Sequence, residues 1–228
     1  MGQSLLFGSV ASAALVLGAL IGSQVTLPEH VYALLLGFAG GALISALAFE
    51  LFSDAERHGG VRLAAVGLVV GAAVFVLVDA VVIERARGST ASFGLLAAVT
   101  IDGIPENLAL GVTLVEDASY ALLVAIAASN LPESLGSATR MRSDGRSTTF
   151  ILAVWLGAGV LLAASVVLGR AALGEASGGT LALLLGFAGG AVLASLADTV
   201  LPEAFEHGGP FVAFSVVAGF LVSYVLAA

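Results

Sequence analysis

The stretch Ala33-Leu-Leu-Leu-Gly-Phe-Ala-Gly-Gly-Ala42 occurs twice in this chain, because it returns unchanged at residues 182–191. The wider segments 33–60 and 182–209 align without gaps at a constant offset of 149 residues. They are identical at 16 of 28 positions, and both end in the polar sequence His-Gly-Gly. That shared polar end indicates a true internal repeat rather than two similar glycine-rich apolar helices.

The composition indicates that this repeat lies in a membrane. Of the 228 residues, 59% are hydrophobic and 11% are charged, and the mean hydropathy is +1.10. Because about 20 apolar residues span a bilayer as a helix, we expect an all-α integral membrane protein with a single transmembrane domain over residues 1–228. The expected helices lie at about 4–25, 31–53, 62–83, 92–115, 118–139, 147–170, 180–202 and 210–227.

Eight spans make the repeat an inverted one, because its copies lie in the second and seventh spans and an odd step reverses direction across the membrane. Inverted-topology repeats are typical of transporters that alternate access around a central site. The fourth and fifth spans form a second pair, in which Asp102-Gly-Ile-Pro-Glu-Asn107 resembles Ser129-Asn-Leu-Pro-Glu-Ser134. The predicted arrangement is therefore 3+2+3 helices.

Charge and cysteine content exclude several classes of function. The chain has no cysteine and a formal net charge of −8, which argues against thiolate ligands, disulfides and nucleic-acid partners. No nucleophile–histidine pair or phosphate loop suggests an enzyme or a bound cofactor. With the N-terminus outside, five Arg residues fall in inside loops and three in outside loops. This bias predicts a cell-membrane protein with both termini outside.

Three acidic residues, Asp102, Glu106 and Glu133, lie near the centres of the fourth and fifth spans. An ionisable residue at the bilayer centre costs about 2.5–3.5 kcal/mol even on the lenient insertion scale. No Lys, Arg or His lies at that depth in any predicted span. The missing positive charge is best supplied by a bound cation, or by protons when the cation is absent.

The spacing of these residues supports one cation site. Asp102 and Glu106 are four residues apart, and Asn130 and Glu133 are three apart, so each pair shares a helix face. The proline before each glutamate has no N–H, so it frees a backbone carbonyl on the preceding turn. Carboxylates and freed carbonyls at one depth form an oxygen cage for a cation. Further possible oxygen ligands are Asn107, Ser129 and Ser134. The alternative is that protonated carboxylates simply bond the helices together.

Two segments, Ile104-Pro-Glu-Asn-Leu-Ala-Leu-Gly-Val112 and Asn130-Leu-Pro-Glu-Ser-Leu-Gly136, resemble the paired motifs of the ZIP (Zrt/Irt-like) metal transporters. The resemblance covers essentially the whole chain. It implies eight helices in a 3+2+3 plan, both ends outside and a homodimer. It also implies transport of a divalent metal, zinc or iron or manganese, toward the cytoplasm.

The match is uneven at the metal ligands. The family's fourth helix usually reads His-Asn-x-Pro-Glu-Gly, whereas this chain has Asp102 and Gly103 at the first two positions. In the fifth helix the family usually has His or Gln followed by Glu or Asp, where this chain has Ser129-Asn130. Glu106 and Glu133 match directly. The resemblance therefore implies one main metal site rather than two.

Residues nearer the ends of the spans are candidates for the entrance and exit. The family often has an acid before Pro-Glu in the seventh helix, which corresponds here to Asp198, and we include it in the expected metal ligands. Glu50 has a similar place in the second span. His58 and His207, in the repeated His-Gly-Gly ends, are candidates for passing metal to the pathway, although loop histidines are more often simply solvated.

Two other interpretations fit part of the pattern. Calcium/cation exchangers also contain Ser/Asn-x-Pro-Glu, but their motifs lie in well-separated halves, whereas here they are 27 residues apart on adjacent helices. A membrane scaffold that transports nothing does not explain buried acids placed twice after proline.

The replacement of the family's histidine by Asp102 predicts an all-oxygen site, which suits Mn²⁺ better than an imidazole site does. Asp102→His should therefore raise the Zn²⁺/Mn²⁺ ratio of initial uptake rates severalfold in proteoliposomes. An unchanged ratio would mean that Asp102 does not set selectivity.

Overall fold

The computed structural model describes residues 2–86, 103–115, 118–173 and 176–227. Within these ranges the chain is predominantly helical and contains no strand, so the predicted all-α class is confirmed. A helix also covers 103–113, between α3 and α5. The helices and helical turns are α1 (Gly2–Gly22), α2 (Glu29–Ala46), the π-helical turn η1 (Leu47–Phe52), α3 (Ser53–Ala86), α5 (Tyr120–Ser143), α6 (Thr148–Leu173), α7 (Gly178–Ser195), the π-helical turn η2 (Leu196–Val200), α8 (Leu201–Gly208), the 3₁₀ turn η3 (Gly209–Phe211) and α9 (Val212–Ala227).

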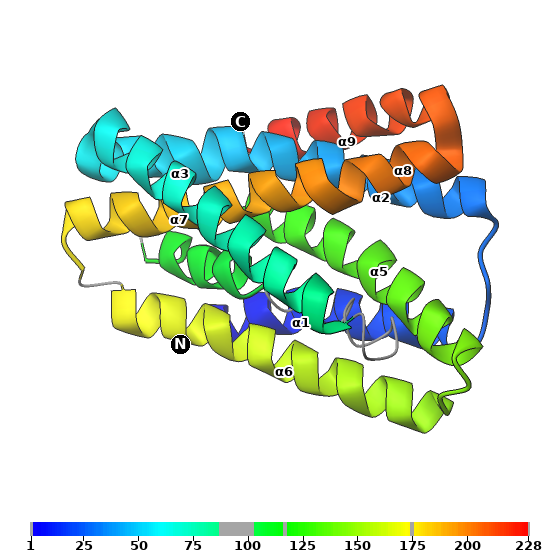
Figure 1. Ribbon diagram of the computed structural model, residues 1–228. Coiled ribbons are helices and arrows are strands. Elements are labelled where there is room, and N and C mark those ends of the chain that lie inside the picture. The colour runs from blue at the N-terminus through cyan, green and yellow to red at the C-terminus, as the bar shows by residue number, and fades with distance from the viewer. Residues whose placement is uncertain (1, 87–102, 116–117, 174–175, 228) are drawn as a thin grey trace.

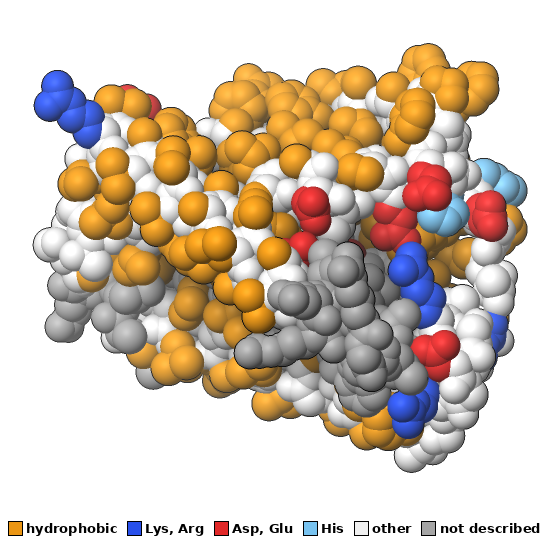
Figure 2. Space-filling model, viewed as in Figure 1, with side chains coloured by type: hydrophobic (Ala, Val, Ile, Leu, Met, Phe, Trp, Pro, Cys, Tyr) orange, Lys and Arg blue, Asp and Glu red, His pale blue; other side chains and the backbone are white. Residues whose placement is uncertain are grey.

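Four helical segments are long and apolar enough to cross a membrane: Gly2–Gly22, Glu29–Val81, Thr148–Ala171 and Gly178–Ala227. Apolar side chains cover most of the visible surface between the two ends of the molecule (Figure 2). The chain therefore has the character of an integral membrane protein. The described residues do not by themselves establish the eight-span plan, because part of the expected fourth span, 92–102, lies outside them.

Two of these segments, of 53 and 50 residues, are more than twice as long as one span requires. Each folds back on itself, as the ribbon shows where α2 leads into α3 and where α8 leads into α9 (Figure 1). The backbone leaves the helical region at Gly60, with φ 80°, and at Gly209, with φ 62°. Glycine adopts such positive φ values at no steric cost.

These reversals correct two expected helix ends. The polar residues 54–60 were predicted to form a loop, but α3 begins at Ser53 and its helix continues to Gly59. Likewise the seventh span was expected to end at 202, whereas α8 remains helical to Gly208. In both places the polar residues belong to the helix, and the chain reverses direction only at the glycine that follows them.

The internal repeat is also a structural repeat. The π-helical turns η1 and η2 begin at Leu47 and Leu196, which are 149 residues apart, and the reversals at Gly60 and Gly209 have the same separation. A π-turn inside an α-helix is uncommon and frequently lies at a functional site. Its presence at the same place in both copies shows that the repeat preserves helix geometry as well as sequence.

The chain forms two hairpins, α2 with α3 and α7 with α8 and α9. They contact each other through glycines, so that helices of one hairpin pair with helices of the other. On α2, Gly41 lies against the backbone of Val216 in α9. On α7, its repeat counterpart Gly190 lies against the backbone of Leu68 in α3. The first helix of each hairpin therefore packs on the second helix of the other. Small residues allow this approach, which is a main source of helix association in lipid.

The remaining helices form the layer that carries the expected site. The helix α1 packs along α5 and α6. Gly18 and Gly22 of α1 lie directly over the carbonyls of Leu131 and Leu135 in α5. The helix at 103–113 shares one buried apolar cluster with α5, to which both contribute side chains. The two motif-bearing helices therefore contribute to the same apolar core of the bundle.

Gly190→Ala tests the glycine contact. A methyl group at this position would overlap the carbonyl oxygen of Leu68, and backbone at a helix contact cannot move aside easily. We expect a loss of about 1–3 kcal/mol in the free energy of unfolding, measured as a lower midpoint of thermal unfolding in detergent.

The matched control is Gly157→Ala, on the exposed side of α6, where an added methyl meets no atom within 4 Å. This variant should be as stable as the original or slightly more stable, because alanine favours a helix over glycine. Equal destabilisation by both substitutions would contradict the role given to the α7–α3 contact.

Candidate cation site

Glu106 is a buried acid within the first turns of the helix at 103–113. Its exposed fraction is 5%, and its neighbour Asn107 is fully buried. The side-chain nitrogen of Asn107 donates to the carbonyl oxygen of Gly103 at 2.8 Å. The side-chain oxygen Oδ1 of Asn107 has no hydrogen-bond partner. A buried polar oxygen without a partner is costly, so this turn holds acceptor capacity that the protein itself leaves unused.

The second motif supplies a buried polar face on α5. Ser129, Asn130 and Ser134 are buried, and Glu133 is half-buried. The hydroxyl of Ser129 donates to the carbonyl of Ile126 at 3.1 Å, and that of Ser134 donates to the carbonyl of Asn130 at 2.6 Å. Serines that bond back to their own helix keep their oxygen lone pairs available.

Pro132 lies inside α5, directly before Glu133. It has no N–H, so it cannot donate the usual helical hydrogen bond to the carbonyl of Ala128 on the preceding turn. The freed carbonyl lies beside Ser129, among the buried oxygens of this turn.

Asn130 also holds α5 against α1 through a hydrogen bond. Its side-chain nitrogen donates to the carbonyl oxygen of Ala11 in α1 at 3.1 Å. Nearby, Gly18 of α1 approaches so closely that a methyl group there would overlap Leu131 and Ser134. The helix α1 therefore clamps the turn of α5 that carries the motif, and only the oxygen of the Asn130 amide remains for a cation.

Two of the expected ligands stand apart from this buried group. Asp102 lies outside the described residues. Asp198 is exposed on η2 and lies near enough to Asp79 of α3 for their charges to interact. Within the described ranges, no three His, Asp or Glu side chains lie close enough together to hold a metal ion. Among the expected ligands, those with buried or half-buried side chains in the described residues are Glu106, Asn107, Ser129, Asn130, Glu133 and Ser134.

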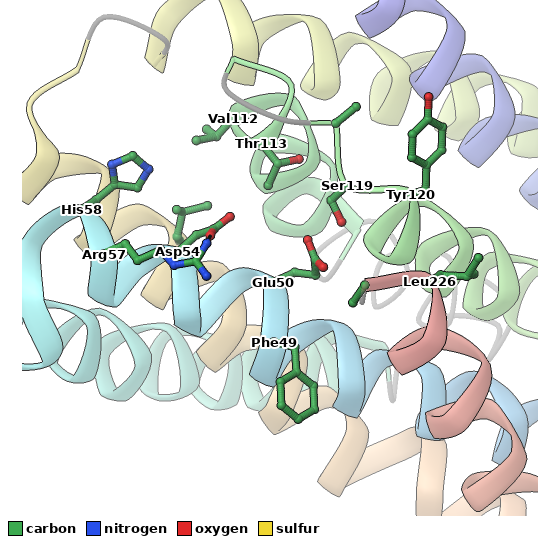
Figure 3. Close-up of a pocket in the computed structure, with 13 residues that line it drawn as sticks. Phe49, Glu50, Asp54, Arg57, His58, Val112, Thr113, Ser119, Tyr120 and Leu226 are labelled. Carbon is green, nitrogen blue, oxygen red and sulfur yellow. Dashed lines mark hydrogen bonds and ion pairs between the residues drawn. The ribbon is translucent and has the colours of Figure 1, made fainter.

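A cavity of about 290 Å³ opens at the end of the molecule where η1 and α3 meet the start of α5. Glu50, Asp54 and His58 line one side, and Thr113 and Ser119 line the other (Figure 3). The sequence pointed to Glu50 and His58 as flanking residues. It offered no signal for the two hydroxyl residues, because they lie beside the connection between the motif helices and belong to no recognisable pattern.

A second, smaller cavity of about 150 Å³ lies at the opposite end and is lined by Tyr32, Gly136, Arg140, Glu203 and His207 among others. Asp54 and His58 of the first cavity correspond to Glu203 and His207 of the second, at the offset of the repeat. The inverted repeat therefore places an acid and a histidine at each end of the bundle.

No protein-family model matches this chain, and a comparison with curated proteins finds no match.

Asn130→Ala tests the clamp between α1 and α5. It leaves the buried carbonyl of Ala11 without this donor, so the free energy of unfolding should fall by about 1–3 kcal/mol. Thermal unfolding in detergent, followed through the fluorescence of buried Trp155, measures the change. Ser129→Ala is the matched control, because its hydroxyl donates within its own helix, and its effect should stay within about 0.5 kcal/mol. Equal losses in the free energy of unfolding for Asn130→Ala and Ser129→Ala would contradict the structural role of Asn130.

Proposed function

We propose that this protein is a ZIP-like transporter that moves a divalent metal cation through the bilayer toward the cytoplasm. In this proposal the metal, zinc or iron or manganese, is the transported substrate. It binds among the oxygens of Glu106, Glu133, Asn107, Asn130, Ser129 and Ser134, together with Asp102. Asp198 serves the pathway from the surface rather than the buried group.

One observation carries the proposal: Glu106 is a buried acid in an apolar bundle, and the side-chain oxygen of the next residue, Asn107, is buried without a hydrogen-bond partner. If this amide only linked two helices by hydrogen bonds, its oxygen would accept a bond from a donor on the neighbouring helix. A cation needs unpaired oxygens, so an unused acceptor next to a buried acid favours cation binding over a purely structural role.

The arrangement of the helices supports a carrier rather than a static binding protein. Two hairpins related by the repeat exchange partners around a layer that holds the motifs, as expected of inverted repeats that alternate access. We propose that they belong to an eight-helix 3+2+3 plan. The start of α1 and the end of α9 lie toward the same end of the bundle (Figure 1), which is compatible with both termini outside. A homodimer is part of the same proposal.

All the candidate ligands are oxygen atoms, and oxygen ligands suit Mn²⁺ and similar hard cations. Affinity still rises toward Zn²⁺ along the divalent series, so zinc remains a good substrate. We therefore expect uptake of Mn²⁺, Fe²⁺ and Zn²⁺, with weaker discrimination among these ions than an imidazole-containing site provides.

Uptake in proteoliposomes tests the proposal directly, with Zn²⁺, Mn²⁺, Fe²⁺ and Ca²⁺ in parallel. Glu106→Gln and Glu133→Gln keep the shape of the side chain but remove its charge. Each should lower uptake by at least about tenfold, the effect of about 1.4 kcal/mol, while the thermal unfolding midpoint stays close to that of the original protein.

Glu56→Gln is the matched control, because it removes one carboxylate charge from an exposed position that lines neither cavity. It should retain most of the uptake. Uptake by the original protein no greater than that of empty liposomes would favour a membrane scaffold, and uptake of Ca²⁺ alone would favour an exchanger. Full uptake by both Gln variants would show that Glu106 and Glu133 do not bind the transported metal.

A further inference from the structure

Three helices meet on one carboxylate at the end of the bundle that holds the smaller cavity. The hydroxyl of Tyr32, on α2, donates to Oε1 of Glu203, on α8, at 3.2 Å. Arg140, near the end of α5, forms an ion pair with the same oxygen. Figure 2 shows acidic, basic and histidine side chains gathered at this end of the molecule. We call Tyr32, Arg140 and Glu203 the latch.

Tyr32 is held in place on two sides. A methyl group on Gly136 of α5 would overlap the Tyr32 hydroxyl, so the ring fits against α5 only because residue 136 has no side chain. On its other side, His207 meets the ring edge-on with centroids 6.2 Å apart. Nδ1 of His207 lies 2.9 Å from the backbone oxygen of Glu203, which fixes the histidine beside the latch.

The latch lies on the same face of α5 as Glu133. Glu133, Gly136 and Arg140 follow one another at three- and four-residue steps, so they form one stripe along α5. Glu133 also lies near enough to Tyr32 to act on it electrostatically. Tyr32 therefore stands between the carboxylate of the site and the ion pair at the end of the helix.

At the other end the repeat counterparts of these residues differ. Asp54, the counterpart of Glu203, forms an ion pair with Arg57 of its own helix at 3.3 Å. The counterpart of Tyr32 is Leu181, whose hydrocarbon side chain has no hydroxyl to donate. The cavity at that end is also larger, about 290 Å³ against about 150 Å³.

From these contacts we infer that Tyr32, Arg140 and Glu203 form the gate on the Arg-rich, cytoplasmic side of the pathway, closed in this conformation. Arg140 occupies the Glu203 carboxylate as an internal cation. Release of the metal requires this contact to break, and the departing cation competes with Arg140 for Glu203. An ion pair as exposed as this one is weak, because water screens it, so it can open in every cycle.

This inference rests on the proposed function, but its first test needs no transport. The chain has no cysteine, so Glu133→Cys places a single thiol at the candidate site. A membrane-impermeant thiol reagent is then applied to inside-out or right-side-out vesicles. Arg140→Gln or Tyr32→Phe, added to this background, should raise labelling from the cytoplasmic side by roughly three- to tenfold, the size expected from losing one weak ion pair or hydrogen bond.

Arg142→Gln is the matched control, because Arg142 lies two residues from Arg140 on the same helix and contacts Thr26 instead. It should leave labelling unchanged. Equal labelling in the Arg140→Gln, Tyr32→Phe and Arg142→Gln proteins would overturn the gate.

A reversible lock supplies the second test. Arg140→Cys and Glu203→Cys, joined by a short bifunctional methanethiosulfonate, should hold the gate closed and abolish metal uptake, and reduction should restore it. Uptake that is unaffected by the crosslink overturns the gate. Absence of uptake in the original protein, together with the expected labelling changes, would instead overturn the proposed substrate and leave the gate standing.

Discussion

The close approach of glycine-bearing helix faces is the constraint on which the rest of this structure depends. Lipid gives helices no hydrophobic reason to associate, so contact area and backbone proximity decide which faces meet. Gly41 and Gly190 allow α2 to meet α9 and α7 to meet α3 at backbone distance. The same principle places α1 on α5 through Gly18 and Gly22. Each contact fixes the position of one helix against its neighbour.

The candidate site makes sense as a compromise between stability and binding. Most polar groups on the motif turns are satisfied locally: serine hydroxyls donate to their own helix, and Asn130 donates to α1. The side-chain oxygen of Asn107 departs from this pattern, since it has no hydrogen-bond partner in an apolar interior. A protein selected only for stability would pair or remove such atoms, whereas a cation carrier needs them.

The two ends of the bundle differ in their contacts although one repeat supplies residues to both. The inverted repeat presents an acid and a histidine at each end, as Asp54 with His58 and Glu203 with His207. The neighbours decide the outcome: Arg57 pairs within its helix, whereas Arg140 reaches from α5 to α8.

Sequence alone determined the helical class, the membrane character, the repeat and the two motif helices, because apolar run length and residue spacing are local properties of the chain. It placed Glu106 and Glu133 in apolar spans, and both are found inside the bundle. It did not determine that residues 54–59 stay helical, that Asp198 is exposed or that Tyr32 reaches Glu203. Those features depend on how helices distant in sequence pack together. The single-glycine reversals and the meeting of α2, α5 and α8 on one carboxylate are therefore decided by tertiary structure.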